Sequence, residues 1–132
     1  MRDALTQSQL QPAPAVRRDG SDREQAVMGD FTAAYVRRAL EPRLQGHGTI
    51  EVKKSGQWGV TIVHRYVSEW NGREVSMPIA QLRANGMRMQ LYWKRANGRW
   101  TAYESNAHGP FVDSLDGCLK EIDSDRWGCF WG

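Results

Sequence analysis

An Asn-Gly pair inside residues 89–104, MQLYWKRANGRWTAYE, constrains the fold of this chain more than any other short stretch. Asn-Gly between two runs of β-forming residues is the strongest short signal for a β-hairpin with a two-residue turn. Such a turn at Asn97 and Gly98 places Tyr92 opposite Tyr103. The stretch therefore predicts two neighbouring antiparallel strands in a fixed register.

This register divides the hairpin into two faces, because successive side chains of a strand point to opposite sides. The face predicted to meet the core carries Leu91, Trp93, Arg95, Trp100 and Ala102. The opposite face points to solvent, Arg88 continues it, and Arg65 of an adjacent strand joins it. The predicted binding residues on this outward face are Arg65, Arg88, Tyr92, Lys94, Arg99 and Tyr103.

Two further strands are predicted before the hairpin. Residues 49–54 alternate, and residues 57–67 form a long run rich in Val, Ile, Thr and Tyr. A three-residue loop, Ser55-Gly56-Gln57, would place Val52 opposite Val60 and keep the apolar residues on one side. A third strand is predicted over residues 73–82, where Pro78 indicates either an edge position or a bulge.

Helical patterns flank the strands. Ser21 and Glu24 form a capping box, and an apolar stripe at helical spacing follows: Val27, Met28, Phe31, Tyr35 and Ala39. Pro42 predicts the end of this helix near Leu40. Near the C-terminus, apolar residues at Leu115, Cys118, Leu119 and Ile122 predict a second helix, with Asp113 as its N-cap.

Together these elements predict an α+β fold in the order α-β-β-β-β-β-α. An antiparallel sheet of four to five strands would lie between an N-terminal and a C-terminal helix. The apolar ending WGCFWG should pack down as a short strand or plug. Residues 1–20 have little to bury and are predicted to be a disordered tail, so residues 21–132 would form a single domain.

Charge is spread unevenly along the chain. The net charge is +3, yet residues 48–103 carry +6 and residues 104–132 carry −4. The two cysteines are too few for a disulfide framework, and residues 1–20 lack the apolar region of a signal peptide. No apolar run is long enough to span a membrane. These features favour a cytoplasmic protein with free thiols.

No sequence pattern assigns a reaction, a cofactor or a metal. The histidines His47, His64 and His108 show no metal-ligand spacing, and the acidic residues near the C-terminus do not form a calcium-binding loop. Nucleotide-binding and nucleophile motifs are missing from the sequence. An enzyme that uses His64 and nearby polar groups is still possible, because catalytic residues can be scattered along a chain.

The last third of the chain resembles an uncharacterised bacterial family, the domain of unknown function 3024. The matching residues are Tyr92, Trp93, Arg95, Ala96, Trp100, Tyr103, Asp125, Cys129, Phe130, Trp131 and Gly132. The resemblance covers roughly residues 22–132 and implies a small cytoplasmic bacterial domain, without implying a reaction. Family members usually have a longer link where this chain has Asn97-Gly98.

The sequence thus favours a binding module over an enzyme. The leading hypothesis is a protein-interaction domain that uses the outer face or an edge of its sheet. The alternative is nucleic-acid binding by the same face, since bases stack on aromatic rings while Arg and Lys meet phosphates. The Tyr92–Tyr103 pair could also stabilise the sheet without any ligand. The sequence does not determine the oligomeric state.

Overall fold

Every neighbouring pair of strands in the sheet is antiparallel, and the main strand order follows the sequence, β1-β2-β3-β4-β5, with β6 paired to β4. A computed structural model describes residues 32–104 and 109–131. The strands are β1 (Thr49–Ser55), β2 (Gly59–Val67), β3 (Glu74–Asn85), β4 (Arg88–Lys94), β5 (Trp100–Ala102) and β6 (Val112–Asp113). The predicted α+β class is confirmed, with β6 added to the expected four to five strands.

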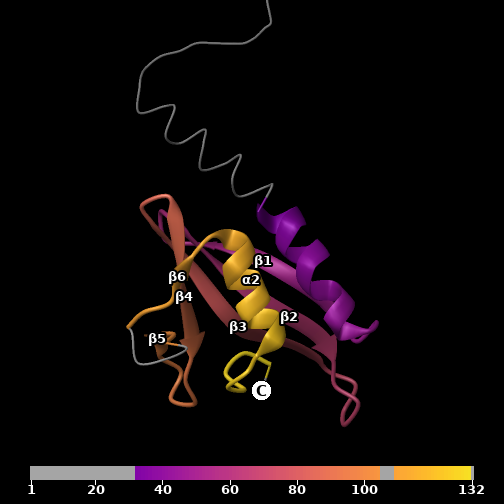
Figure 1. Cartoon of the computed structure of the whole chain (residues 1–132). Helices are drawn as coiled ribbons and strands as arrows, with labels where there is room; N and C mark the ends of the chain where they lie inside the picture. The colour runs from indigo at the N-terminus through magenta and orange to yellow at the C-terminus, as the bar shows by residue number, and fades with distance from the viewer. Residues whose placement is uncertain (1–31, 105–108, 132) are drawn as a thin grey trace, which may run out of the picture. The chain divides into compact units, whose positions relative to one another are not determined.

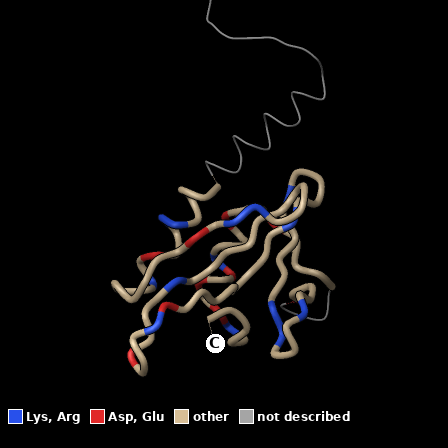
Figure 2. Tube along the Cα trace, turned by 180° about the vertical axis from the view of Figure 1, so that it is seen from behind, with Lys and Arg blue, Asp and Glu red and all other residues tan. Residues whose placement is uncertain are grey.

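Both helices lie across one face of the sheet (Figure 1). The N-terminal helix is helical over residues 32–44 of the described chain, and α2 spans Leu115–Ser124. The core between helices and sheet consists of Val36, Leu40, Leu44, Ile50, Ile62, Ile79, Ala80, Leu82, Leu91, Tyr103, Cys118, Leu119, Ile122 and Phe130. The opposite face of the sheet, here called the outer face, has no helix on it among the described residues (Figure 2).

The N-terminal helix turns a different stripe to the core than the one predicted. Val36, Leu40 and Leu44 are buried, whereas Tyr35 and Ala39 are exposed. The predicted stripe was anchored on residues before position 32, which lie outside the described residues, as do the predicted tail and capping box. In the described part, the buried residues recur at every fourth position, which is the i, i+4 spacing of one helix face.

This helix also runs past the proline that was expected to end it. Helical backbone continues through Pro42 to residue 44, and Gln45 then adopts a left-handed φ of 50°. The prediction of an end near Leu40 is therefore wrong. The additional turn buries Leu44 and places the Glu41 carboxylate within 3.0 Å of the Ile50 backbone N–H, so tertiary contacts outweigh the conformational preference before proline.

The β1–β2 loop has the predicted length but lies one residue later. It contains Gly56, Gln57 and Trp58, and it pairs Val52 with Ile62 instead of Val60. The pairs are thus displaced by two residues. Because side chains alternate with a period of two, the predicted core face of these strands is preserved.

Pro78 lies at a bulge in β3, on a stretch that pairs with β2. Val63 pairs with Pro78 while Ile62 pairs with Ala80, so Ile79 is the extra residue. The bulge allows a residue without a backbone N–H to occupy a central strand. Both predicted alternatives for Pro78 hold in part, because it lies at a bulge and the described pairing with β4 covers only Gln81–Asn85, which leaves this stretch of β3 open on its second side.

The β4–β5 hairpin differs from the predicted register by one residue. Tyr92 pairs with Ala102 and Lys94 pairs with Trp100. The Arg95 N–H donates to the Arg99 carbonyl over 2.9 Å, which leaves a loop of three residues, Ala96, Asn97 and Gly98. Gly98 has a φ of 84°, as expected when a left-handed residue ends a three-residue hairpin loop. The predicted two-residue turn is wrong.

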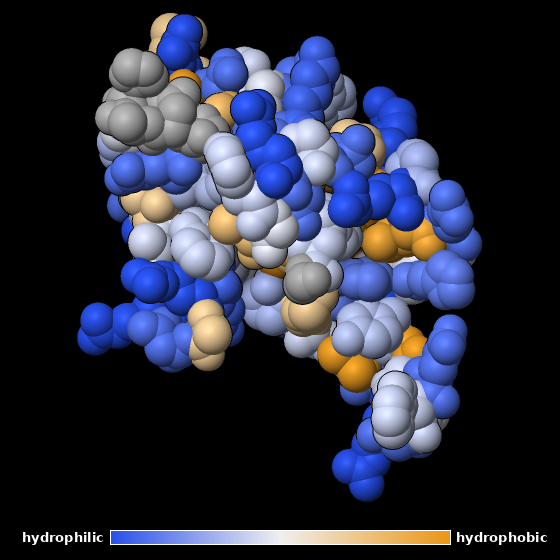
Figure 3. Space-filling model, turned by 60° about the horizontal axis from the view of Figure 1, so that its bottom comes forward, coloured by the Kyte–Doolittle hydropathy of each residue, from blue (hydrophilic) through white to orange (hydrophobic). Residues whose placement is uncertain are grey.

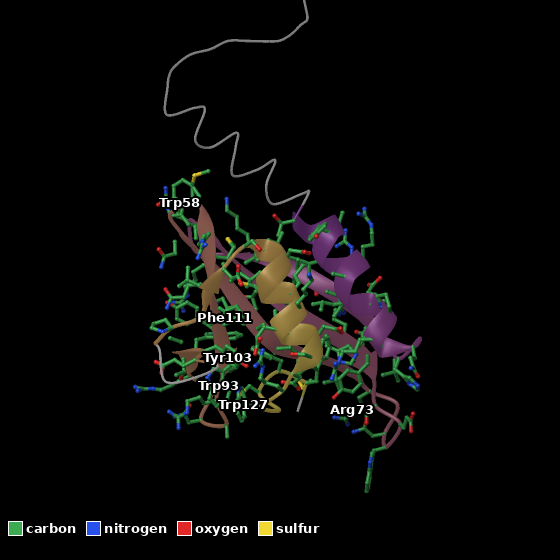
Figure 4. All side chains as sticks on the ribbon, in the orientation of Figure 1. Trp58, Arg73, Trp93, Tyr103, Phe111 and Trp127 are labelled. Atoms are coloured by element: carbon green, nitrogen blue, oxygen red, sulfur yellow. The ribbon has the colours of Figure 1, made fainter. Side chains whose placement is uncertain are left out.

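The corrected register exchanges the faces of the second strand, because a slip of one residue reverses every side chain. Trp100 and Ala102 lie on the outer face, whereas Tyr103 points into the core with 1 % of its surface exposed. Tyr103 lies beside Phe111, with ring centroids 6.0 Å apart, at the β5 edge of the sheet (Figure 4). Its hydroxyl donates to the Glu121 carboxylate on α2 over 2.6 Å.

The edge next to β4 is built from two separate pieces of chain. The Leu91 carbonyl accepts the Tyr103 N–H over 2.9 Å, and the Leu91 N–H donates to the Phe111 carbonyl over 3.0 Å. The Phe111 N–H in turn donates to the Tyr103 carbonyl over 2.8 Å. The chain therefore leaves the edge after Tyr103 and rejoins it at Phe111, which leads into β6.

Helix α2 begins one residue later than predicted, and the chain after it is fixed by one aspartate. Ser114, not Asp113, is the N-cap, and its hydroxyl accepts the Gly117 N–H over 3.1 Å. After the helix, the Asp125 carboxylate accepts the backbone N–H groups of Phe130 (3.0 Å) and Trp131 (3.2 Å). Phe130 is buried, so the expected packing of the apolar ending is confirmed, as a plug and not as a strand.

We expect Asp125→Ala to lower the free energy of unfolding by about 2 kcal/mol, because two backbone N–H groups lose a charged acceptor and alanine tolerates the left-handed backbone poorly. Chemical denaturation measures the change. Asp123→Ala is the matched control on the same segment and should cost less than about 0.5 kcal/mol, since its side chain is exposed. Equal losses for both variants would contradict the anchoring role of Asp125.

Candidate functional site

Cross-strand pairing arranges the side chains of the outer face in rows that cross five strands. Cross-strand pairing places Lys53, Thr61, Gln81, Tyr92 and Ala102 in one row. Adjacent rows place Arg83 opposite Gln90 and Lys94 opposite Trp100. Basic and aromatic side chains thus come together on this face from segments far apart in the sequence.

Four of the six predicted binding residues lie on the outer face: Arg65, Arg88, Tyr92 and Lys94. Tyr103 does not, because it is buried against α2. Arg99 pairs with Arg95 through the backbone and so lies on the helix side of the sheet, at the tip of the hairpin. The prediction that Arg99 and Tyr103 share a face with Tyr92 is therefore wrong, because it depended on the two-residue turn.

Arg65 is on the outer face, but its charge is already paired. Its guanidinium lies 3.5 Å from a Glu51 carboxylate oxygen and 3.3 Å from one of Glu74. All three side chains are partly exposed, so these ion pairs contribute little to stability. They do neutralise the β1–β2 end of the outer face.

The remaining part of the face keeps its positive charge. We call Lys53, Arg83, Arg88, Tyr92, Lys94 and Trp100 the basic outer patch. Within the described residues, none of its cations has a carboxylate at salt-bridge distance. The patch is therefore a surface of uncompensated charge.

Cations lie over both aromatic rings of the basic outer patch. The Arg83 guanidinium carbon lies 3.9 Å from the centre of the Tyr92 ring, and the Lys94 ammonium lies 5.8 Å from that of Trp100. Arg83 also donates from Nε to the Gln81 side chain over 2.7 Å. Gln81 itself is buried, with 5 % of its surface exposed.

Gln81 anchors this arrangement to the strands beneath. Its amide nitrogen donates to the hydroxyls of Ser55 (2.8 Å) and Thr61 (3.0 Å). The side-chain oxygen is then left to accept from Arg83. This network fixes the position of the Arg83 guanidinium before any partner binds.

Sequence reasoning missed Lys53, Arg83 and Trp100 as patch residues. Lys53 could have been found, because it follows the inward-facing Val52 and neighbouring side chains of a strand point to opposite faces. Arg83 was missed because the third strand was predicted to end at residue 82. Trp100 was assigned to the core by the wrong turn, and it is the one patch residue for which local sequence gave a misleading signal.

A second feature, at the opposite end of β1 and β2, is a hollow of about 850 Å³ beside the projecting β2–β3 turn (Figure 3). It is lined by Gly46, His47, Gly48, Thr49, His64, Arg65, Tyr66, Val67, Ser68, Glu69, Trp70 and Glu74. The hollow contains His64, the residue on which the enzyme hypothesis depended. It is open and its lining is mixed in charge.

The contacts of His64 fix the orientation of its ring. Its Nε2 lies 2.8 Å from the His47 carbonyl, which can only accept, so Nε2 carries the proton. The ring also lies 4.7 Å from the Tyr66 ring and 5.9 Å from that of Trp131. Among the described residues, no hydroxyl, thiol or carboxylate is hydrogen-bonded to His64. The geometry thus supplies an oriented imidazole without a nucleophile bound to it.

Both cysteines are free. Burial raises the pKa of the Cys118 thiol to about 12, and burial also raises that of Cys129. The thiolate is the reactive form, so Cys118 is an unreactive thiol at neutral pH. No group of three or more potential metal ligands occurs in the described chain, and none of its helices is long and apolar enough to cross a membrane.

The comparisons with known proteins identify a family and nothing beyond it. The family model described as a domain of unknown function, DUF3024, matches residues 18–132. No curated protein and no solved structure matches the chain. The function must therefore be argued from the surfaces described above.

The corrected hairpin register predicts different costs for the same substitution at two tyrosines. Tyr103→Phe should lower the free energy of unfolding by about 1–2 kcal/mol, because Glu121 loses a hydrogen bond in the core. Tyr92→Phe should change it by less than about 0.5 kcal/mol, since no hydrogen bond of the Tyr92 hydroxyl is present among the described residues. Urea denaturation of both variants checks this. A larger cost at Tyr92 would contradict the observed register.

Tyr103 should also make the fold sensitive to alkali. Burial, together with the hydrogen bond to Glu121, raises the pKa of Tyr103 above its ordinary value of 10. A raised pKa means that the folded state favours the neutral phenol, so this stability is present below pH 10 and is lost as the pH rises above it. Between pH 9 and pH 11 we expect the stability of the wild type to fall more steeply than that of Tyr103→Phe. Parallel curves would refute this role.

Proposed function

Since the chain belongs to the DUF3024 family, whose function is unknown, we propose a function from its geometry: the domain binds an acidic protein partner through the basic outer patch. The observation that carries the proposal is the position of Arg83, which lies on Tyr92 while it is hydrogen-bonded to the buried Gln81. A guanidinium held in this way presents its remaining donors outward in a fixed direction, which suits carboxylates.

The size of the patch indicates a macromolecule and not a small ligand. The patch extends from β1 to β5, and neighbouring strands lie about 4.8 Å apart, so it is roughly 19 Å wide. Small-molecule sites are typically hollows that surround the ligand, whereas this patch lies across the face of a sheet. A surface or segment of another chain can contact several of its cations at once.

The charge of the patch indicates an anionic partner. Within the described residues, Lys53, Arg83, Arg88 and Lys94 have no carboxylate at salt-bridge distance. Each is exposed, so it would be paired at low desolvation cost. Complementary charge also speeds association and disfavours basic partners.

The aromatic rings favour a protein over a nucleic acid. A base that stacks on Tyr92 would have to displace Arg83, which would break its hydrogen bond to Gln81. Lys94 lies similarly over Trp100. A partner therefore meets the cations before it meets the ring faces. Carboxylates can bind to these cations without contact with the rings.

Nucleic-acid binding is the second candidate, and one observation favours it. Tyr92 and Trp100 lie on adjacent strands of one face, each with a cation over its ring, and aromatic rings with nearby cations are the combination that binds single-stranded nucleic acids. If Arg83 and Lys94 swing away, the rings become stacking platforms. This candidate predicts a steep fall of affinity with salt.

We expect the double variant Arg88→Ala/Lys94→Ala to bind a glutamate-rich peptide about five- to tenfold more weakly than the wild type, because two patch charges are lost. The control is Arg37→Ala/Lys120→Ala, which removes the same charge from exposed helix positions and should change affinity by less than about twofold. Fluorescence anisotropy measures both.

Two other results would speak against the proposal. Equal weakening by the patch and control variants would show that net charge alone governs binding. Tighter binding of a single-stranded oligothymidylate with the same formal charge, lost in Tyr92→Ala and steeply salt-dependent, would favour the second candidate.

A further inference from the structure

The open side of β1 adjoins the basic outer patch at Lys53 but offers backbone groups that the patch does not. β1 ends the strand order, and no described strand pairs with its second side. Figure 2 shows β1 as the upper edge of the sheet, with a basic stretch toward its end. This stretch is Lys53 and Lys54, both exposed and both without a partner among the described residues.

One hydrogen bond determines which backbone groups of β1 point outward. The Ile50 N–H donates to the Glu41 carboxylate over 3.0 Å, so it does not donate to β2. In an antiparallel ladder, residues alternate between those bonded to the neighbour and those that point away. Ile50 is of the second kind, and therefore Val52 and Lys54 are too. Their N–H and C=O groups face the open side.

The Glu41–Ile50 bond also limits the length of this open edge. It occupies the Ile50 N–H, which leaves the groups of Val52 and Lys54, about 7 Å apart along the strand. An added segment could thus pair over two or three residues. Such short β-pairing gives affinity through backbone bonds and specificity through the neighbouring side chains.

The side chains at this edge select for acidic residues. Lys53 points to the outer face and Lys54 to the other, because neighbours in a strand alternate. Two consecutive acidic residues on an added strand would meet both lysines, and opposite charges across a strand pair are stabilising. A basic or neutral segment lacks this contribution.

Pairing with a second copy of β1 is disfavoured in each register that the outward groups allow. A two-fold centred on residue 53 places Lys53 opposite Lys53, and one centred on residue 54 opposes Lys54 to itself. A two-fold centred on Val52 opposes Lys53 to Glu51, but it leaves Val52 as the one fully bonded pair, because the flanking pairs would need the Ile50 N–H that Glu41 already accepts. Lysines at open edges commonly prevent self-association in this way.

We propose that the β1 edge, at Val52 and Lys54, accepts an extended segment of a partner protein that carries two consecutive acidic residues. The segment adds a strand to the sheet through the outward N–H and C=O groups of these two residues. The proposal shares the acidic protein partner and Lys53 with the function above, but it depends on the open backbone groups of Val52 and Lys54, which the basic outer patch does not use. The two therefore fail in different experiments.

The test uses the full chain and a short peptide with Glu-Asp at its centre between threonine and valine. Lys54→Pro removes the outward N–H without removing a bond to β2, and proline is tolerated at such edge positions. We expect Lys54→Pro to weaken binding at least about tenfold and Lys54→Ala, which loses only the charge, by about threefold or less. Isothermal titration calorimetry gives both values.

Hydrogen exchange identifies the surface independently of these variants. Bound peptide should slow exchange at the Val52 and Lys54 amides, which face the open side, with smaller effects at Glu51 and Lys53, which are already paired to β2. Should Lys54→Pro unfold, peptides methylated on alternate backbone nitrogens replace it, and these should not bind.

Each alternative result overturns the proposal. Unchanged affinity of Lys54→Pro, or binding by the methylated peptides, would exclude backbone pairing. Equal affinity for a peptide with Lys-Lys at its centre would exclude the charge selection. A dimer of the free protein that Lys54→Pro dissociates would assign the edge to a second copy. Loss of binding in Arg88→Ala/Lys94→Ala alone would place the peptide on the basic outer patch.

Discussion

The hydrogen bond from the Tyr103 hydroxyl to Glu121 is the contact on which the rest of this structure depends. Glu121 is 5 % exposed and would be costly to bury unless its charge were paired. Tyr103 and Arg126 both donate to it, over 2.6 Å and 2.8 Å. The contact joins the β5 edge to α2, and it requires Tyr103 to face inward. That requirement sets the hairpin register, which in turn places Trp100 on the outer face.

The order of elements could be predicted from the sequence because apolar periodicity reports local structure directly. The prediction of which strand residues face the core and which face solvent depended on the geometry of the turns. At the β1–β2 loop the error was two residues, so Val52 stayed on its predicted side. At Asn97 the error was one residue, and the faces of β5 were exchanged. The free energy gained from a preferred turn type is smaller than that gained by pairing a buried charge such as Glu121. The sequence does not show that Glu121 lies beside Tyr103.

The candidate site could be predicted in part for the same reason. Arg88, Tyr92 and Lys94 were found because β4 alternates regularly around buried Leu91. The role of Arg83 could not be found, because its stacking on Tyr92 depends on the pairing of β3 with β4. Four separate segments make up this surface, so its residues can be identified only when the pairing of the strands is known. The positive charge of the surface could be predicted, because residues 48–103 carry a net positive charge.

The two-part edge beside β4 has a consequence for how such a domain can vary. A backbone hydrogen bond between Tyr103 and Phe111 joins the two points where the chain leaves and rejoins the sheet. The number of residues between these points can therefore change without moving either strand, and lengthening a closed loop costs little entropy. This edge is a natural place for insertions, natural or engineered, which would add new contacts beside the sheet while leaving both the core and the outer face as they are.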